Sequence, residues 1–275
     1  MKKLYFAIFT LLLFFLSGCG NDNSNENKNI RPQVLLTNDN YKAITVDALR
    51  SMVVSTDLEL PIDANQLLQS FNDKLKCDNN GKINYVQILP TIIKITFEQC
   101  MIYGYNLTGD ITLKQIDKNT QEYKTSDLYA KTDSSEITLK NSTVRISYDN
   151  NAKITKVNEH INGSLRLSDN RLYKYNNFRL ITYDLTSDTV KVGFKGDVST
   201  PCIDNKWVRI KSQRDLTIPN GTDCPTSGLA YVYGKDNSRV KTLFKTDTSI
   251  DMALIGGDET SYNNCYDMLD EGCQP

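Results

Sequence analysis

Histidine, the side chain with the widest catalytic repertoire near neutral pH, occurs once in this chain, at His160. A Ser-His-Asp or Cys-His hydrolase would have to use it, and no Gly-x-Ser-x-Gly elbow supplies a nucleophile. Zinc sites built from two or three histidines are excluded by the count. With Asn158 and Asn162 beside it, His160 is typical of an ordinary hairpin residue, and we predict no catalytic residue.

Carboxylates could still act without histidine, because a glycosidase needs only two acids about 5 to 10 Å apart. The acids of this chain are scattered through turn-like segments, where solvation and capping are their usual roles. Asp78-Asn79-Asn80-Gly81 lacks the ligand spacing of a calcium loop and predicts a turn. No glycine-rich phosphate loop or dinucleotide fingerprint occurs, so we expect no cofactor and no metal.

Cys19 belongs to the N-terminal segment of the chain. The other six cysteines are an even number, which predicts disulfides if the chain is exported. Pairs of sequence neighbours need the least topology, so we predict 77 with 100, 202 with 224, and 265 with 273. Zinc is the weaker alternative, because the spacings are long and no Cys-x-x-Cys pair occurs. The disulfide candidates are Cys77, Cys100, Cys202, Cys224, Cys265 and Cys273.

Cys19 stands at the end of an export signal. Lys2 and Lys3 precede an apolar run from Leu4 to Leu16 that is too short to span a bilayer, which needs about 20 residues. The sequence Leu16-Ser17-Gly18-Cys19 resembles the lipobox of bacterial lipoproteins. The resemblance implies that residues 1–18 are a signal peptide, and that acyl chains on Cys19 anchor the protein to a membrane.

The residue after Cys19 and the composition bear on location and partners. The residue after Cys19 is Gly20. An Asp at this position would resemble a signal that retains lipoproteins in the inner membrane. Its absence favours location in an outer membrane, facing the periplasm or the surface. Cleavage leaves 30 basic against 33 acidic residues, a net charge of about −3. Such a chain has no electrostatic case for binding nucleic acid.

The chain has 15 tyrosines against one tryptophan, Trp207. Several tyrosines lie two residues apart, so that each pair faces one side of its strand. Half-buried sheet faces explain such pairs, and so do contacts with a carbohydrate or a protein. The pairs are Tyr103 with Tyr105, Tyr173 with Tyr175, and Tyr231 with Tyr233.

The N-terminal part of the mature chain predicts a tether followed by helices. Residues 19–40 comprise the lipidated cysteine and an Asn-rich segment with little to bury, most of which we expect to be disordered. Apolar residues at steps of three and four predict a helix over 38–55 and a second over 63–75. We expect the segment 41–76 to pack on a sheet.

After Cys77, alternation separated by Asn, Asp and Gly predicts strands over most of the chain. Parallel strands would need long helical crossovers that are missing here, so residues 77–275 predict an antiparallel domain. The predicted fold class is therefore mainly β, an extended antiparallel meander or sandwich with one or two short N-terminal helices. The predicted strands include 92–97, 110–115, 122–130, 143–148, 154–157, 161–167, 172–175, 178–183, 189–194, 207–211, 229–233, 239–244 and 249–254.

The segment Cys224-Pro-Thr-Ser-Gly-Leu-Ala-Tyr-Val-Tyr-Gly234 is similar to a closing stretch in uncharacterised secreted or lipid-anchored proteins of proteobacteria. That resemblance implies no activity. It implies a turn followed by a strand that carries Leu229, Tyr231 and Tyr233 on one face.

These observations predict a lipid-anchored, non-enzymatic envelope protein whose β surface contacts a protein or glycan. Two alternatives stay open. An envelope-assembly or lipid-handling accessory would need an apolar groove between sheet and helices. A carboxylate-dependent envelope glycan hydrolase would need convergent acids in a cleft.

Overall fold

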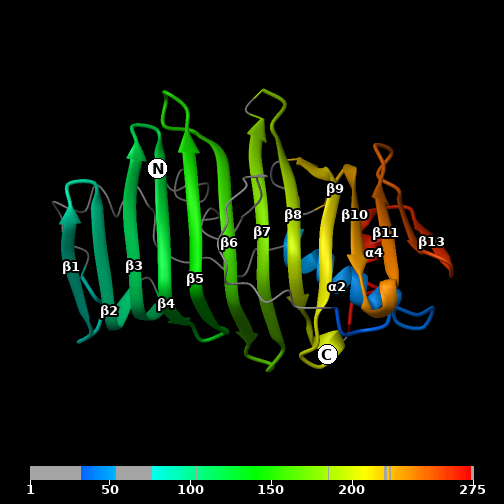
Figure 1. Cartoon of the computed structure of the whole chain (residues 1–275), viewed down its shortest axis with the longest axis horizontal. Helices are drawn as coiled ribbons and strands as arrows, with labels where there is room; N and C mark the ends of the chain where they lie inside the picture. The colour runs from blue at the N-terminus through cyan, green and yellow to red at the C-terminus, as the bar shows by residue number, and fades with distance from the viewer. Residues whose placement is uncertain are drawn as a thin grey trace.

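The computed structural model describes residues 32–53, 76–102, 104–184, 186–219, 222 and 224–273. Within these residues, thirteen strands form one antiparallel sheet whose order in space is their order in sequence (Figure 1). The predicted mainly-β antiparallel class is confirmed, as a meander. The strands are β1 (Lys82–Leu89), β2 (Ile92–Ile102), β3 (Tyr105–Asp117), β4 (Thr120–Lys131), β5 (Ser135–Tyr148), β6 (Ile154–Leu167), β7 (Leu172–Asp184), β8 (Thr189–Ser199), β9 (Val208–Pro219), β10 (Ser227–Tyr233), β11 (Arg239–Phe244), β12 (Ile250–Leu254) and β13 (Glu259–Tyr262).

Several strands are longer than the sequence predicts. The segments 154–157 and 161–167 are one strand, β6, and 172–175 and 178–183 are one strand, β7. Asn158 and Asn176 interrupt the apolar pattern there, and the pattern predicts turns because asparagine disfavours strands. In the structure both pair within the ladder, Asn158 opposite Leu180 and Asn176 opposite Asp197. Strand β13 and the short helix α4 (Cys265–Leu269) were not predicted.

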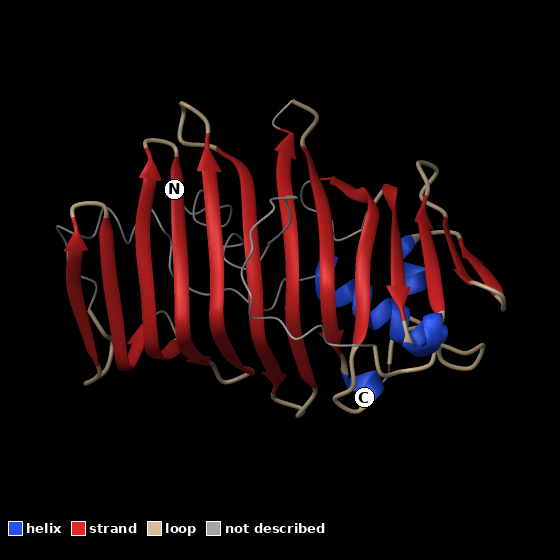
Figure 2. Cartoon of the chain, in the orientation of Figure 1, coloured by secondary structure: helices blue, strands red, loops and turns tan. Residues whose placement is uncertain are grey.

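Helix α2 (Tyr41–Val53) packs on one side of the sheet, against β8 and β9 (Figure 2). It also contacts α4 and the 3₁₀ turn η2 (Pro201–Ile203). We call this side of the sheet the covered face; its side chains include the buried Val198 and Ile210. The opposite side is the open face. The predicted helix over 63–75 lies outside the described residues, and no described helix is long and apolar enough to cross a membrane.

Residues 33–36 correct the predicted end of the tether. The Gln33 backbone N–H donates to the Trp207 carbonyl over 2.9 Å, and the Lys235 N–H donates to the Val34 carbonyl over 2.6 Å. Leu36 is buried in the core. The chain therefore joins the folded domain well before residue 40, because the apolar residues after Pro32 find a core to enter. Residues 1–31, which include Cys19 and the predicted signal peptide, lie outside the described residues.

The disulfides confirm one predicted pair and correct two. Cys77 bonds Cys100 as predicted. Cys202 bonds Cys273 and Cys224 bonds Cys265, so both predicted pairs among these four residues are wrong. The reason is topological: after β13 the chain turns back, and α4 packs on α2 beside η2. This return brings the last cysteines to partners 71 and 41 residues earlier.

Candidate functional site

The open face carries a row of four side chains that lie directly opposite one another on adjacent strands. Phe178 on β7 is opposite Lys195 on β8, and Lys195 is opposite Lys211 on β9. Tyr231 on β10 is in turn opposite Lys211. Neighbouring strands are about 4.8 Å apart, so the row is about 14 Å long. Strand pairing thus brings two aromatic rings and two ammonium groups into one line.

His160 extends this row onto β6. Its imidazole stacks on the Phe178 ring, with centroids 4.3 Å apart and planes 5° apart. Its Nε2 lies 3.3 Å from Asn176 Oδ1. Burial lowers the pKa of His160 below its usual 6.5, so a neutral imidazole lies on Phe178 at neutral pH. His160 is therefore a mid-strand ring in an aromatic stack, and not the hairpin residue that the sequence predicts.

A shallow groove crosses this part of the open face. Phe178, Lys195 and Lys211 line it together with Trp207, the single tryptophan of the chain. Pro32, Gln33 and the 3₁₀ turn η3 (Lys235–Asn237) also line it. Tyr233 also lines it and stacks with Tyr231, with ring centroids 5.9 Å apart. The groove is thus lined by half-buried aromatic rings and exposed cations.

The carboxylate most buried in this groove is Asp197. It accepts two hydrogen bonds from Arg209, to Oδ1 at 2.8 Å and to Oδ2 at 3.1 Å. Burial raises the pKa of Asp197, and the hydrogen bonds from Arg209 oppose that shift. With both oxygens held by one guanidinium, Asp197 is placed as a structural partner of Arg209.

Comparisons of the chain with protein-family models, with curated proteins and with solved structures found no match. The function proposed for this chain therefore rests on the sequence and on the geometry of the described residues.

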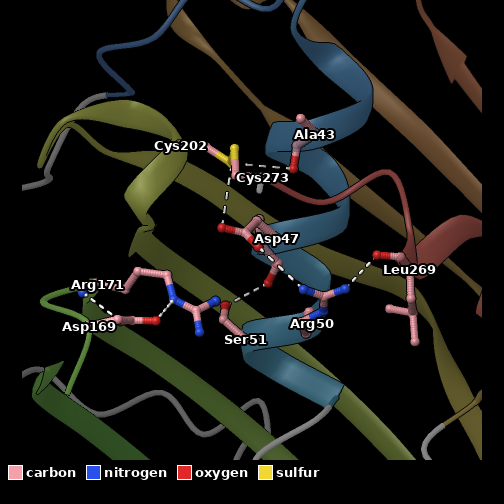
Figure 3. A network of polar contacts seen from close by, with 10 residues as sticks. Ala43, Asp47, Arg50, Ser51, Asp169, Arg171, Cys202, Leu269 and Cys273 are labelled. Atoms are coloured by element: carbon pink, nitrogen blue, oxygen red, sulfur yellow. Dashed lines mark hydrogen bonds and ion pairs between the residues drawn. A yellow bond between two sulfur atoms is a disulfide. The ribbon is translucent and has the colours of Figure 1, made fainter. Parts of the chain in front are cut away.

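On the covered face, a polar network surrounds the disulfide between Cys202 and Cys273 (Figure 3). Asp47 of α2 is buried, and its Oδ2 lies 3.4 Å from the Cys202 sulfur. Burial raises the pKa of Asp47, and nearby Arg50 opposes the shift. Arg50 also donates to the Leu269 carbonyl of α4. Asp47 and the two sulfurs lie within 4.8 Å of one another, but sulfurs bonded to each other offer no thiolate to a metal.

A second buried polar group lies at mid-sheet on the covered face. Glu159 on β6 is opposite Arg179 on β7, and both are buried. Among the described residues, neither Glu159 carboxylate oxygen has a hydrogen-bond partner. Burial therefore raises the pKa of Glu159 well above its usual value, against the attraction of Arg179. This site holds an acid that is protonated more easily than any exposed carboxylate.

The structure divides the tyrosine pairs between the two faces. Tyr173 and Tyr175 are buried on the covered face, whereas Tyr231 and Tyr233 lie half-buried on the open face, as the alternation after Cys224 predicts. Tyr103 lies outside the described residues. Sequence reasoning missed Phe178, Lys195 and Lys211 as a group, because they meet only through strand pairing. The available signal was one aromatic residue in each of two strands that flank a pair of lysine-bearing strands.

Proposed function

We propose that this chain is a lipid-anchored, non-enzymatic envelope protein that binds a glycan on the open face of its sheet. The observation that carries the proposal is the groove lined by Phe178, Trp207, Tyr233 and the neighbouring cations. Flat amphipathic rings pack against the apolar faces of sugar rings, while charged and polar groups at their edges bind hydroxyl and acidic substituents.

The distribution of apolar surface favours a glycan over a protein partner at this groove. Among the described residues, none of the exposed large apolar side chains lines the groove, and three of them are on β1: Val86, Ile88 and Leu89. Protein interfaces concentrate such residues at their centre. The groove instead combines half-buried rings with charge, which suits a hydrated, polar ligand.

Neither alternative function draws comparable support. A glycan hydrolase would need a free acid and a free base in the groove. Asp197 is held through both oxygens by Arg209, and Asp236 lies 3.9 Å from Lys235 in an exposed turn. A lipid-handling accessory would need an apolar cavity under α2, whereas the groove lies on the opposite face.

The anchor is the part of the proposal that rests on sequence, on the lipobox-like Leu16-Ser17-Gly18-Cys19. We expect the intact mass of the chain from the membrane fraction to correspond to a start at Cys19 plus acyl groups. In the Cys19→Ala variant we expect the acyl mass to be lost and the chain to leave the membrane. A wild-type chain that is unacylated and soluble would contradict the anchor.

Removing the two aromatic rings at the ends of the row, Phe178 and Tyr231, is expected to weaken glycan binding. We expect the double variant Phe178→Leu/Tyr231→Leu to bind at least about tenfold more weakly than wild type, because leucine keeps apolar bulk but offers no flat ring. The measurement is retention of dextran, polygalacturonate and phosphomannan on the full-length mature chain immobilised from detergent.

A matched control is Tyr266→Leu, which removes an exposed ring from α4, away from the groove. Its binding should equal that of wild type. If wild type retains none of the three polysaccharides, or if the double variant retains them as wild type does, the glycan-binding proposal is wrong. Capture of a protein by the same face would point to the protein-binding alternative.

A further inference from the structure

We infer that the groove selects anionic glycans, and that the Lys195–Lys211 pair is its anion-binding element; this inference rests on the proposed function. The two lysines are exposed and directly opposite on β8 and β9. Like charges in that arrangement destabilise a sheet. A pair that costs stability and is flanked by an aromatic ring on each side is better explained by a ligand than by folding.

The surroundings leave the charge of this pair uncompensated. Among the described ion pairs, none involves Lys195 or Lys211, although carboxylates lie nearby in the fold. Asp197 is bound to Arg209 through both oxygens. Lys195 instead has its ammonium group 5.6 Å from the centre of the Phe178 ring, a cation–π contact that orients the side chain without neutralising it.

The order of the row matches the chemistry of an acidic sugar. Phe178 and Tyr231 lie at its two ends and the lysines between them. A chain of sugars laid across these strands would stack rings on the aromatics and place an acidic group over the ammonium pair. Two ammonium groups suit a carboxylate of a uronic acid or a phosphate on a sugar, since both spread negative charge over several oxygens.

The location of the groove bears on where such a ligand would come from. Pro32, which lines the groove, is only 13 residues after Cys19. Fully extended, that length reaches about 45 Å, so an anchored chain keeps the groove near its own membrane. A phosphorylated glycolipid of that membrane and a uronate-bearing polysaccharide beyond it both fit the chemistry, and the experiment separates them.

The test uses the full-length mature chain and three probes: polygalacturonate for carboxylates, phosphomannan for phosphates, and dextran as a neutral glycan. For Lys195→Gln/Lys211→Gln we expect at least a tenfold loss of affinity for the anionic probe that wild type prefers. We also expect that affinity to fall as salt is raised. The preferred probe identifies the source of the anion.

A matched control is Lys156→Gln/Lys191→Gln, which removes two exposed lysines from β6 and β8 on the same face, outside the groove. It makes the same change in net charge and should bind as wild type does. The thermal midpoint provides a second readout, because neutralising the opposed pair should leave it unchanged or raise it. A purely structural role for the pair would lower it.

Each outcome bears on a different claim. Dextran bound as tightly as the anionic probes, or a groove variant that binds as the control variant does, would overturn the charge inference and leave glycan binding standing. Failure of wild type to retain any probe would overturn the proposed function itself. Loss of anionic binding in the groove variant alone supports both.

Discussion

Replacing Cys202 and Cys273 together by serine is expected to lower the free energy of unfolding by about 4 kcal/mol. The two cysteines are 71 residues apart in sequence, and because the Cys224–Cys265 bond closes part of that span, the Cys202–Cys273 bond restricts an effective loop of about 30 residues (202–224 plus 265–273) in the unfolded chain. It also ties the end of the chain to η2 beneath α2, where Arg50 and Leu269 make a further link. Urea unfolding of wild type and the variant measures the loss, under conditions that neither reduce the other disulfides nor oxidise any free thiol.

The matched comparison is Cys77→Ser/Cys100→Ser, which opens a loop of 23 residues from the segment before β1 to β2. Its loss should be similar, because effective loops of about 30 residues and of 23 residues differ by only about 0.2 kcal/mol in loop entropy. Equal stability of wild type and the Cys202/Cys273 variant would contradict the disulfide assignment. Peptide mapping without reduction would then be expected to show other pairs.

Replacing Glu159 by glutamine is expected to remove a pH dependence of stability. Because the pKa of Glu159 is raised in the folded state, the unfolded chain loses this proton at a lower pH than the folded chain. The contribution of Glu159 to stability is therefore fully present below its unfolded-state pKa near 4.5. That contribution is lost as the pH rises from there toward the folded-state pKa. The slope for one proton is at most about 1.4 kcal/mol per pH unit.

Glu159→Gln should thus match wild type near pH 4 and be more stable than wild type at neutral pH. Urea unfolding at several pH values between 4 and 8 tests this. Glu136→Gln is the control, since Glu136 on β5 is only partly buried and pairs with Lys131 at 2.6 Å; its effect should stay within about 0.5 kcal/mol. If Glu159→Gln is instead less stable than wild type at neutral pH, Glu159 is charged there and supports Arg179.

The sequence predicts the fold class well because its strongest signal is local. Alternation and turn residues repeat along the chain, and a meander pairs each strand with its sequence neighbour. The errors arose where a local signal was ambiguous. Asparagine is common in turns, yet Asn158 and Asn176 lie within long strands. Cys202 and Cys273 meet only because the chain end returns over α2, and no local pattern records that return.

The candidate site could be predicted only in part. The Tyr231–Tyr233 pair and its strand face follow from alternation, and Trp207 stands out by its rarity. The row through Phe178, Lys195 and Lys211 depends on the register of four strands. A shift of one residue in any of them would send its side chain to the covered face. Composition carries no information on that register.

The most direct test of glycan binding on the open face uses the fluorescence of Trp207. It is the only tryptophan of the chain, and it lines the groove. Titration of the mature chain with polygalacturonate or phosphomannan is expected to change its emission saturably, and Lys195→Gln/Lys211→Gln should weaken that response at least tenfold. A polysaccharide that the chain retains without any change in Trp207 emission would place the ligand elsewhere and contradict the account.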